Sequence, residues 1–160
     1  MSRSYYVYCC MNTLVLIIFF SLMIPQEFNG YTLFTPFSSN GEGERATLLM
    51  DNDYNIIHTW VNDFLPASMP YLLPDSSIIY PYMVEFPSMT AGGVGGGVQK
   101  ILSNGNVVWD YVFADSLYQH HHDIEPLPNG NVLIIVWEKK YMSEAYNMGR
   151  IDIDQWVTNE

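Results

Sequence analysis

Two stretches of the chain recur as β-hairpin patterns, and this repeat constrains the fold more than any other feature. Residues 53–60 align with residues 104–111 at an offset of 51, and the segment around Pro74 aligns with the segment around Pro128 at an offset of 54. A period near 50 residues with several short strands in each unit is typical of β-propellers. The sequence therefore predicts an all-β chain of propeller blades, each a four-stranded antiparallel unit.

The repeat also predicts how many blades are present. One complete blade is expected over residues 69–113, a second begins at His120, and pieces of an earlier one precede residue 60. Closed propellers contain about four to eight blades, whereas two open blades leave apolar edges and faces that invite aggregation. We therefore expect the chain to be the N-terminal part of a longer protein. Assembly from copies of itself, as a homo-oligomer, is the alternative.

Turn residues and apolar runs mark the individual hairpins. The Asn-Gly pairs at 104–105 and 129–130 tolerate positive φ, which predicts two-residue primed turns. The runs 78–84 and 132–137 show little polar alternation. Strands with this pattern are buried on both faces, as the inner strands of a stacked blade would be.

Other segments carry weaker signals. Residues 142–149 have the clearest helical pattern, and residues 150–153 are a candidate third strand of the last unit. The glycine-rich patch at 92–97 has two interpretations, an anion cradle of backbone N–H groups or a place where glycines permit close backbone approach. We favour the second, because no Lys-Ser/Thr pair or helix pattern follows the patch.

Composition excludes several classes of partner. Only six Lys and Arg residues stand against 17 Asp and Glu, which gives a formal net charge of −11. A nucleic-acid-binding protein needs cationic side chains to neutralise phosphates. Nucleic acid and an anionic membrane surface are therefore both excluded as expected partners. The acidic residues are spread along the chain, as on a solvated surface.

Residues 1–30 differ in character from the rest of the chain. The apolar stretch at 14–24 is short for a bilayer span and typical of a signal peptide core, with an uncleaved N-terminal anchor as the alternative. The only cysteines, Cys9 and Cys10, lie upstream of it. No disulfide framework, thiolate metal site or thiol nucleophile is therefore expected in the propeller portion, residues 31–160. We predict an exported protein, periplasmic or extracellular.

Three consecutive histidines, His120, His121 and His122, precede Asp123 at the start of the last hairpin. In a regular strand His120 and His122 share one face and His121 lies on the other. Three roles are open: an imidazole for acid–base or nucleophilic work whose tautomer Asp123 fixes, a His-x-His pair that binds a metal, or a polar strand start hydrogen-bonded to loops. The isolated His58 is expected to be structural.

The run His-His-Asp-Ile-Glu-Pro-Leu-Pro-Asn-Gly-Asn-Val-Leu resembles the arylsulfotransferase (aryl-sulfate sulfotransferase) family. The resemblance extends to the earlier Gly-Gly-Gly-Val-Gln-Lys-Ile and Gly-Asn-Val-Val-Trp-Asp-Tyr segments and to Trp-Glu-Lys-Lys after the hairpin, and covers about residues 31–150. It implies a six-bladed propeller, incomplete in this chain and exported in bacteria. It also implies transfer of a sulfuryl group from an aryl sulfate donor to a phenolic acceptor through a sulfated histidine, without a nucleotide donor. We expect no cofactor and no metal.

The family's His-Asp motif matches His122 and Asp123 best, with His121 as second choice, and these three are the candidate catalytic residues. The resemblance places His122 in the channel as a binding or acid–base partner. The sulfated nucleophile and an anion-binding Arg are expected on later blades. Two other classes stay open: a non-catalytic exported propeller that acts as a binding or scaffold module, and a quinone-cofactor dehydrogenase propeller, which Trp60 and Trp109 support only faintly.

Overall fold

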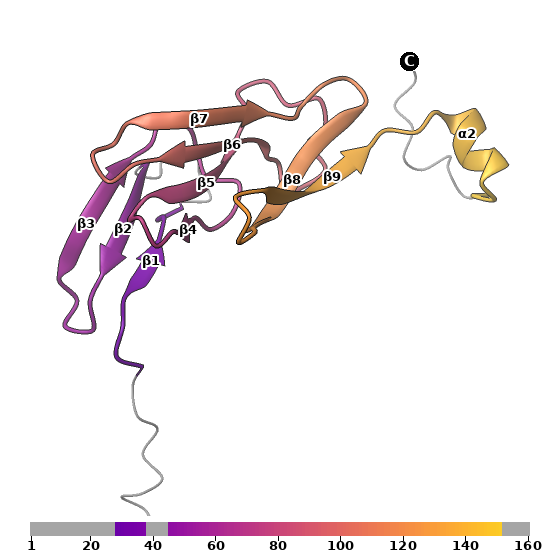
Figure 1. The fold of residues 1–160 in the computed structure, drawn as a ribbon. Helices are drawn as coiled ribbons and strands as arrows, with labels where there is room; N and C mark the ends of the chain where they lie inside the picture. Colours follow the sequence, from indigo (N-terminus) through magenta and orange to yellow (C-terminus); the bar gives the residue numbers. More distant parts are fainter. Residues whose placement is uncertain (1–27, 38–44, 152–160) are drawn as a thin grey trace, which may run out of the picture. The chain divides into compact units, whose positions relative to one another are not determined.

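The computed structural model describes residues 28–37 and 45–151, and the chain divides into two units, Met1–Gly30 and Tyr31–Glu160. The described part of the second unit consists mainly of antiparallel β-strands, which confirms the all-β prediction (Figure 1). The predicted leader lies almost wholly outside the described residues, as does half of the predicted strand at 150–153, whose described half is not in a strand. No helix in the described ranges is long and apolar enough to cross a membrane.

The strands of the described residues form three sheets. The first contains β1 (Thr32–Phe34), β2 (Ala46–Met50) and β3 (Ile56–Val61). The second contains β4 (Tyr71–Leu72), β5 (Ile78–Met83), β6 (Gly96–Ile101) and β7 (Val107–Val112), in that order across the sheet. The third contains β8 (Tyr118–Pro126) and β9 (Val132–Glu138). The helix α2 (Met142–Asn147) follows β9 and confirms the helical signal there.

The turns that close the hairpins β2–β3, β4–β5, β6–β7 and β8–β9 share one geometry. In the β6–β7 turn, the Leu102 N–H donates to the Asn106 carbonyl and the Gly105 N–H donates to the Leu102 carbonyl, both at 2.9 Å. The other three turns repeat these bonds, and the residue at the Gly105 position has positive φ each time. This is a three-residue loop with one left-handed residue. The expected positive φ is present, but the expected two-residue primed turns are wrong.

The first and third sheets pack on opposite faces of the second sheet. Side chains of β5 alternate between them: Ile78 and Tyr80 pack with Trp60 of β3, whereas Ile79 packs with Ile124 of β8. Each successive side chain of β5 therefore meets a core, and the strand is buried on both faces as its apolar sequence predicts.

β9 does not follow the same prediction. Its side chains alternate between half-buried and exposed, and Leu133 and Ile135 are 58% and 51% exposed. Val132 and Ile134 pack against the second sheet. On the other face Trp137 is half-buried and stacks on His121, whereas Leu133 and Ile135 stay more than half exposed, so the expected burial on both faces is wrong there.

The glycine-rich patch serves close packing. A Cβ on Gly97 would overlap the ring of Tyr82, one on Gly93 would overlap the ring of His122, and one on Gly95 would lie 2.6 Å from Nδ1 of His120. The patch therefore lets a buried tyrosine and two histidines approach the backbone, which confirms the favoured interpretation of these glycines.

Candidate functional site

The histidines of β8 lie in a bulge. The pairing of β8 with β9 shifts between His120 and Ile124, so that residues 121–123 lie beside the ladder rather than in it. His122 has a φ of 57°, and its N–H donates to the Gly93 carbonyl at 2.9 Å. Side chains in a bulge no longer alternate regularly. The expected arrangement, with His120 and His122 on one face and His121 on the other, is therefore wrong.

His120 is a buried part of the packing, with no exposed surface. Its Nδ1 accepts the Gly96 N–H at 3.1 Å, so the neutral ring carries its proton on Nε2. Burial lowers the pKa of His120, and the nearby main chain of Asp123 partly opposes that shift. The Nδ1 of His120 is thus occupied, and the described residues contain no group of three or more His, Cys, Asp or Glu arranged to hold a metal.

His121 and His122 form an imidazole pair. Their Nδ1 atoms lie 2.7 Å apart, so one ring donates a proton to the other. The His121 ring also stacks on Trp137, with centroids 4.4 Å apart and planes at 19°. Burial, followed by the charge of His122, lowers the pKa of His121. His121 therefore favours the neutral form that accepts at Nδ1, and His122 is assigned as the donor.

Asp123 does not orient His122. Its carboxylate accepts the Tyr71 hydroxyl at 3.2 Å and the Ser68 hydroxyl at 3.3 Å, and also the Ile124 N–H at 2.9 Å. Burial and the charge of Asp123 raise the pKa of Tyr71. His121 therefore contacts Nδ1 of His122, where Asp123 was expected to fix the tautomer. Asp123 instead connects β8 to Ser68 and Tyr71, which precede β5.

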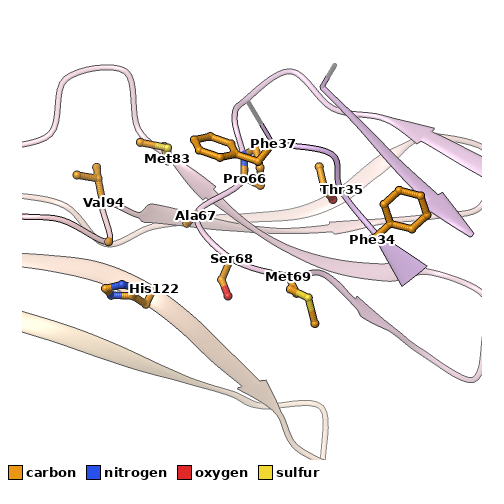
Figure 2. A pocket seen from close by; sticks show the side chains of 11 residues that line it. Phe34, Thr35, Phe37, Pro66, Ala67, Ser68, Met69, Met83, Val94 and His122 are labelled. Carbon is orange, nitrogen blue, oxygen red and sulfur yellow. The ribbon is translucent and has the colours of Figure 1, made fainter. Parts of the chain in front are cut away.

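A pocket of about 440 Å³ opens beside His122 (Figure 2). Its walls are mainly aromatic, thioether and other apolar side chains: Phe34, Phe37, Pro66, Ala67, Met69, Met83 and Val94. Thr35 and Ser68 add hydroxyl groups, and His122 is the one ionisable side chain among the described lining residues. Figure 2 shows His122 to the left of Ser68 and Met69, on a different segment of the chain from these two residues. The pocket suits a flat apolar ligand with one polar or anionic group at the imidazole.

Of the predicted site residues, the structure brings His121 and His122 together and turns Asp123 to other partners. His58 makes an edge contact with Trp60, with ring centroids 4.2 Å apart, which agrees with a structural role. No sequence pattern pointed to Tyr71 or Ser68, because each contacts Asp123 from more than 50 residues away. No family model, curated protein or solved structure matches the chain.

Proposed function

We propose that the chain forms part of a β-propeller whose pocket binds an aryl sulfate for sulfuryl transfer to a phenolic acceptor. One observation carries the proposal: His122, paired with His121, is the one ionisable side chain among the described residues that line an otherwise apolar pocket. An aromatic ring that bears a single anionic group matches this combination.

The blade assignment is supported by the second sheet and by the turns. β4 to β7 form a four-stranded antiparallel meander in chain order, as a propeller blade does. All four hairpin turns share one geometry, and the sequence repeat matches β8–β9 with β4–β5 and β2–β3 with β6–β7. On this assignment β8 and β9 are the first half of a following blade, and β2 and β3 are the second half of a preceding one. A closed ring needs blades beyond the described residues.

The imidazole pair can bind the sulfuryl group as a cation. A doubly protonated His122 would donate from Nδ1 to His121 and from Nε2 to a sulfuryl oxygen. When the bond between sulfur and the aryl oxygen breaks, its electron pair stays on the phenolate oxygen, which takes the Nε2 proton of His122. The sulfuryl group passes to a nucleophilic histidine that we place on a later blade. In the second half-reaction, the phenolic acceptor attacks sulfur and returns its proton to His122.

The proposal is tested first by ligand binding. The full chain should bind 4-nitrophenyl sulfate more tightly than 4-nitrophenol or inorganic sulfate in calorimetric titrations. Loss of a charge-assisted hydrogen bond costs about 1.5–3 kcal/mol, so H122A should weaken binding of the sulfate ester roughly 10- to 100-fold. H58A removes a histidine outside the pocket and should bind like wild type. Equal binding by H122A and wild type would refute the assignment of His122.

A second candidate function is favoured by the absence of cationic Lys and Arg side chains from the described pocket lining. Anion sites in proteins usually contain such a residue. A non-catalytic binding module for an uncharged aromatic ligand fits this lining. Tighter binding of 4-nitrophenol than of its sulfate ester would select that function. Phenol-dependent release of 4-nitrophenol from the ester, by a protein with a completed ring, would select transfer.

A further inference from the structure

β7 exposes an aromatic face that a sheet interior would normally cover. All six of its residues are exposed, and Trp109 and Tyr111 are 41% and 46% exposed with their rings stacked 6.1 Å apart. A groove of about 660 Å³ lies between this face and β9, lined among others by Trp109, Tyr111, Val132 and Leu133. The groove is mainly apolar, and it is lined by the β8–β9 turn and the first three residues of β9.

The repeat shows what such a face looks like when it is covered. Tyr111 corresponds to Trp60 at the offset of 51, yet Trp60 is only 2% exposed. Trp60 packs against Ile78 and Tyr80 of β5 and against Ile101 of β6. We attribute the difference in exposure between Trp60 and Tyr111 to the number of strands that cover each side chain.

The third sheet supplies only part of the equivalent cover for Tyr111. Val132 and Ile134 of β9 occupy the places of Ile78 and Tyr80 at the offset of 54, and both pack toward the second sheet. In the described residues the third sheet has no strand beyond β9 to match β6. The groove between Tyr111 and the start of β9 therefore lies where the cover of Tyr111 is incomplete.

The hairpin of β2 and β3 contains a strand of the kind that the described part of the chain lacks beside β9. β2 and β3 correspond to β6 and β7 by sequence and by turn geometry. Among the described residues, the edge of β2 that corresponds to the β5 edge of β6 is paired only with β1, through Thr32, Leu33 and Phe34. β1 is three residues long and β9 is seven. A longer strand offers more ladder hydrogen bonds at this edge than β1 does.

We propose that β9 pairs antiparallel with β2 of a second copy of this chain and takes the place of β1 there. This inference rests on the blade assignment proposed above. Because Phe34 of β1 lines the pocket beside His122, the pairing also changes that pocket wall. Transferring the β5–β6 register by the two offsets pairs Val132 with Met50, Leu133 with Leu49 and Ile134 with Leu48 of the second copy. The resulting sheet has four strands, β8 and β9 from one copy and β2 and β3 from the other.

The pairing also explains the exposed outer face of β9. In one copy, Leu33 of β1 packs against the core that contains Trp60 and Tyr80. A strand that replaces β1 brings Leu133 and Ile135, now 58% and 51% exposed, against that core. The described strands of each copy amount to two blades, so a ring built from these strands alone contains two to four copies for four to eight blades.

The register makes the interface testable by disulfide trapping. Opposite residues of an antiparallel pair have Cα atoms about 4.5–5.5 Å apart, within the range of a disulfide. In a full-length background with Cys9 and Cys10 changed to serine, L133C chains are mixed with L49C chains and oxidised. We expect a disulfide-linked pair in the mixture but in neither chain alone. Within one copy, Leu49 and Leu133 belong to sheets on opposite faces of the second sheet, so the link must join two copies.

M148C mixed with L133C is the control for random collision, because Met148 is 75% exposed and lies outside the proposed interface. Native mass spectrometry of the unmodified chain should give a mass two to four times that of a single chain. A monomer at that measurement, or cross-linking no greater than in the control, overturns the proposal. A monomer whose β9 amides resist hydrogen exchange would also overturn it, since another part of the same chain then fills the edge. If trapping fails, β1 keeps its place and Phe34 stays in the pocket wall beside His122, so aryl sulfate binding is unaffected. H122A tests that binding without changing β9 or β2, so the two proposals fail separately.

Discussion

Replacing Gly97 with alanine should destabilise the chain strongly, because the position has no room for a methyl group. Gly97 of β6 pairs with Tyr82 of β5, and a Cβ there would overlap the tyrosine ring. Tyr82 is 2% exposed, stacks on Phe64 with centroids 4.3 Å apart, and donates its hydroxyl to Asp110 at 2.8 Å. The ring therefore cannot move aside without losing contacts on every side.

The expected cost has two parts. Inserting a methyl group into a packed core costs about 1–3 kcal/mol. Displacing the tyrosine breaks its hydrogen bond to a carboxylate, which costs about 1.5–3 kcal/mol. Together they give about 2.5–6 kcal/mol, a large share of the 5–15 kcal/mol or so that stabilises a typical domain. Backbone strain adds little, because Gly97 does not have a positive φ.

Urea unfolding followed by tryptophan fluorescence measures this cost. G105A is the matched control, because nothing lies within 4 Å of its added Cβ and only a φ of 85° opposes it. In the double variant G97A/Y82L the smaller side chain frees space, so the two changes should be non-additive by about 0.5–3 kcal/mol. A G97A chain that unfolds at the wild-type midpoint, or strict additivity in the double variant, would refute the steric argument.

Three further predictions concern the site. Burial lowers the pKa of His120 below the usual 6.5, so the unfolded chain binds a proton that the folded chain does not, and the free energy of unfolding should fall as pH drops from about 7 to 5. H120Q should flatten that slope in urea titrations. D123N should lower the pKa of Tyr71 toward 10.0, since burial and then Asp123 raise it, as read from phenolate absorbance against Y71F. G93A should weaken aryl sulfate binding in calorimetry, because its Cβ would overlap the His122 ring.

Local signals in the sequence were sufficient for most of the strands. Turn residues such as Asn104 and Gly105 placed the hairpins correctly, and the apolar run of β5 predicted its burial on both faces. These features depend on residues close in sequence or on a core that forms around one strand. The similar run in β9 failed as a predictor, because an apolar pattern reports what a strand can bury and not which neighbours are present to cover it.

The local geometry of the site depended on contacts far along the chain. The bulge of β8 is held by the Gly93 carbonyl, which accepts the His122 N–H from 29 residues away in the sequence. Asp123 is held by Tyr71, at a separation of 52 residues. Alternation along a strand describes only a regular ladder. It could not predict that His121 and His122 turn toward each other.

The conformation of His122 argues that the bulge serves the pocket. A left-handed conformation costs a non-glycine residue about 1–2 kcal/mol, and His122 adopts one with a φ of 57°. A regular strand would have kept the ladder bonds and avoided that cost. The bulge instead brings two imidazole nitrogens to 2.7 Å and places one ring in the pocket wall. Strained residues persist where their surroundings fix them, and they cluster at binding and catalytic sites. Gly93 supplies both the carbonyl that fixes His122 and the space for its ring, so the proposed binding site depends on both residues.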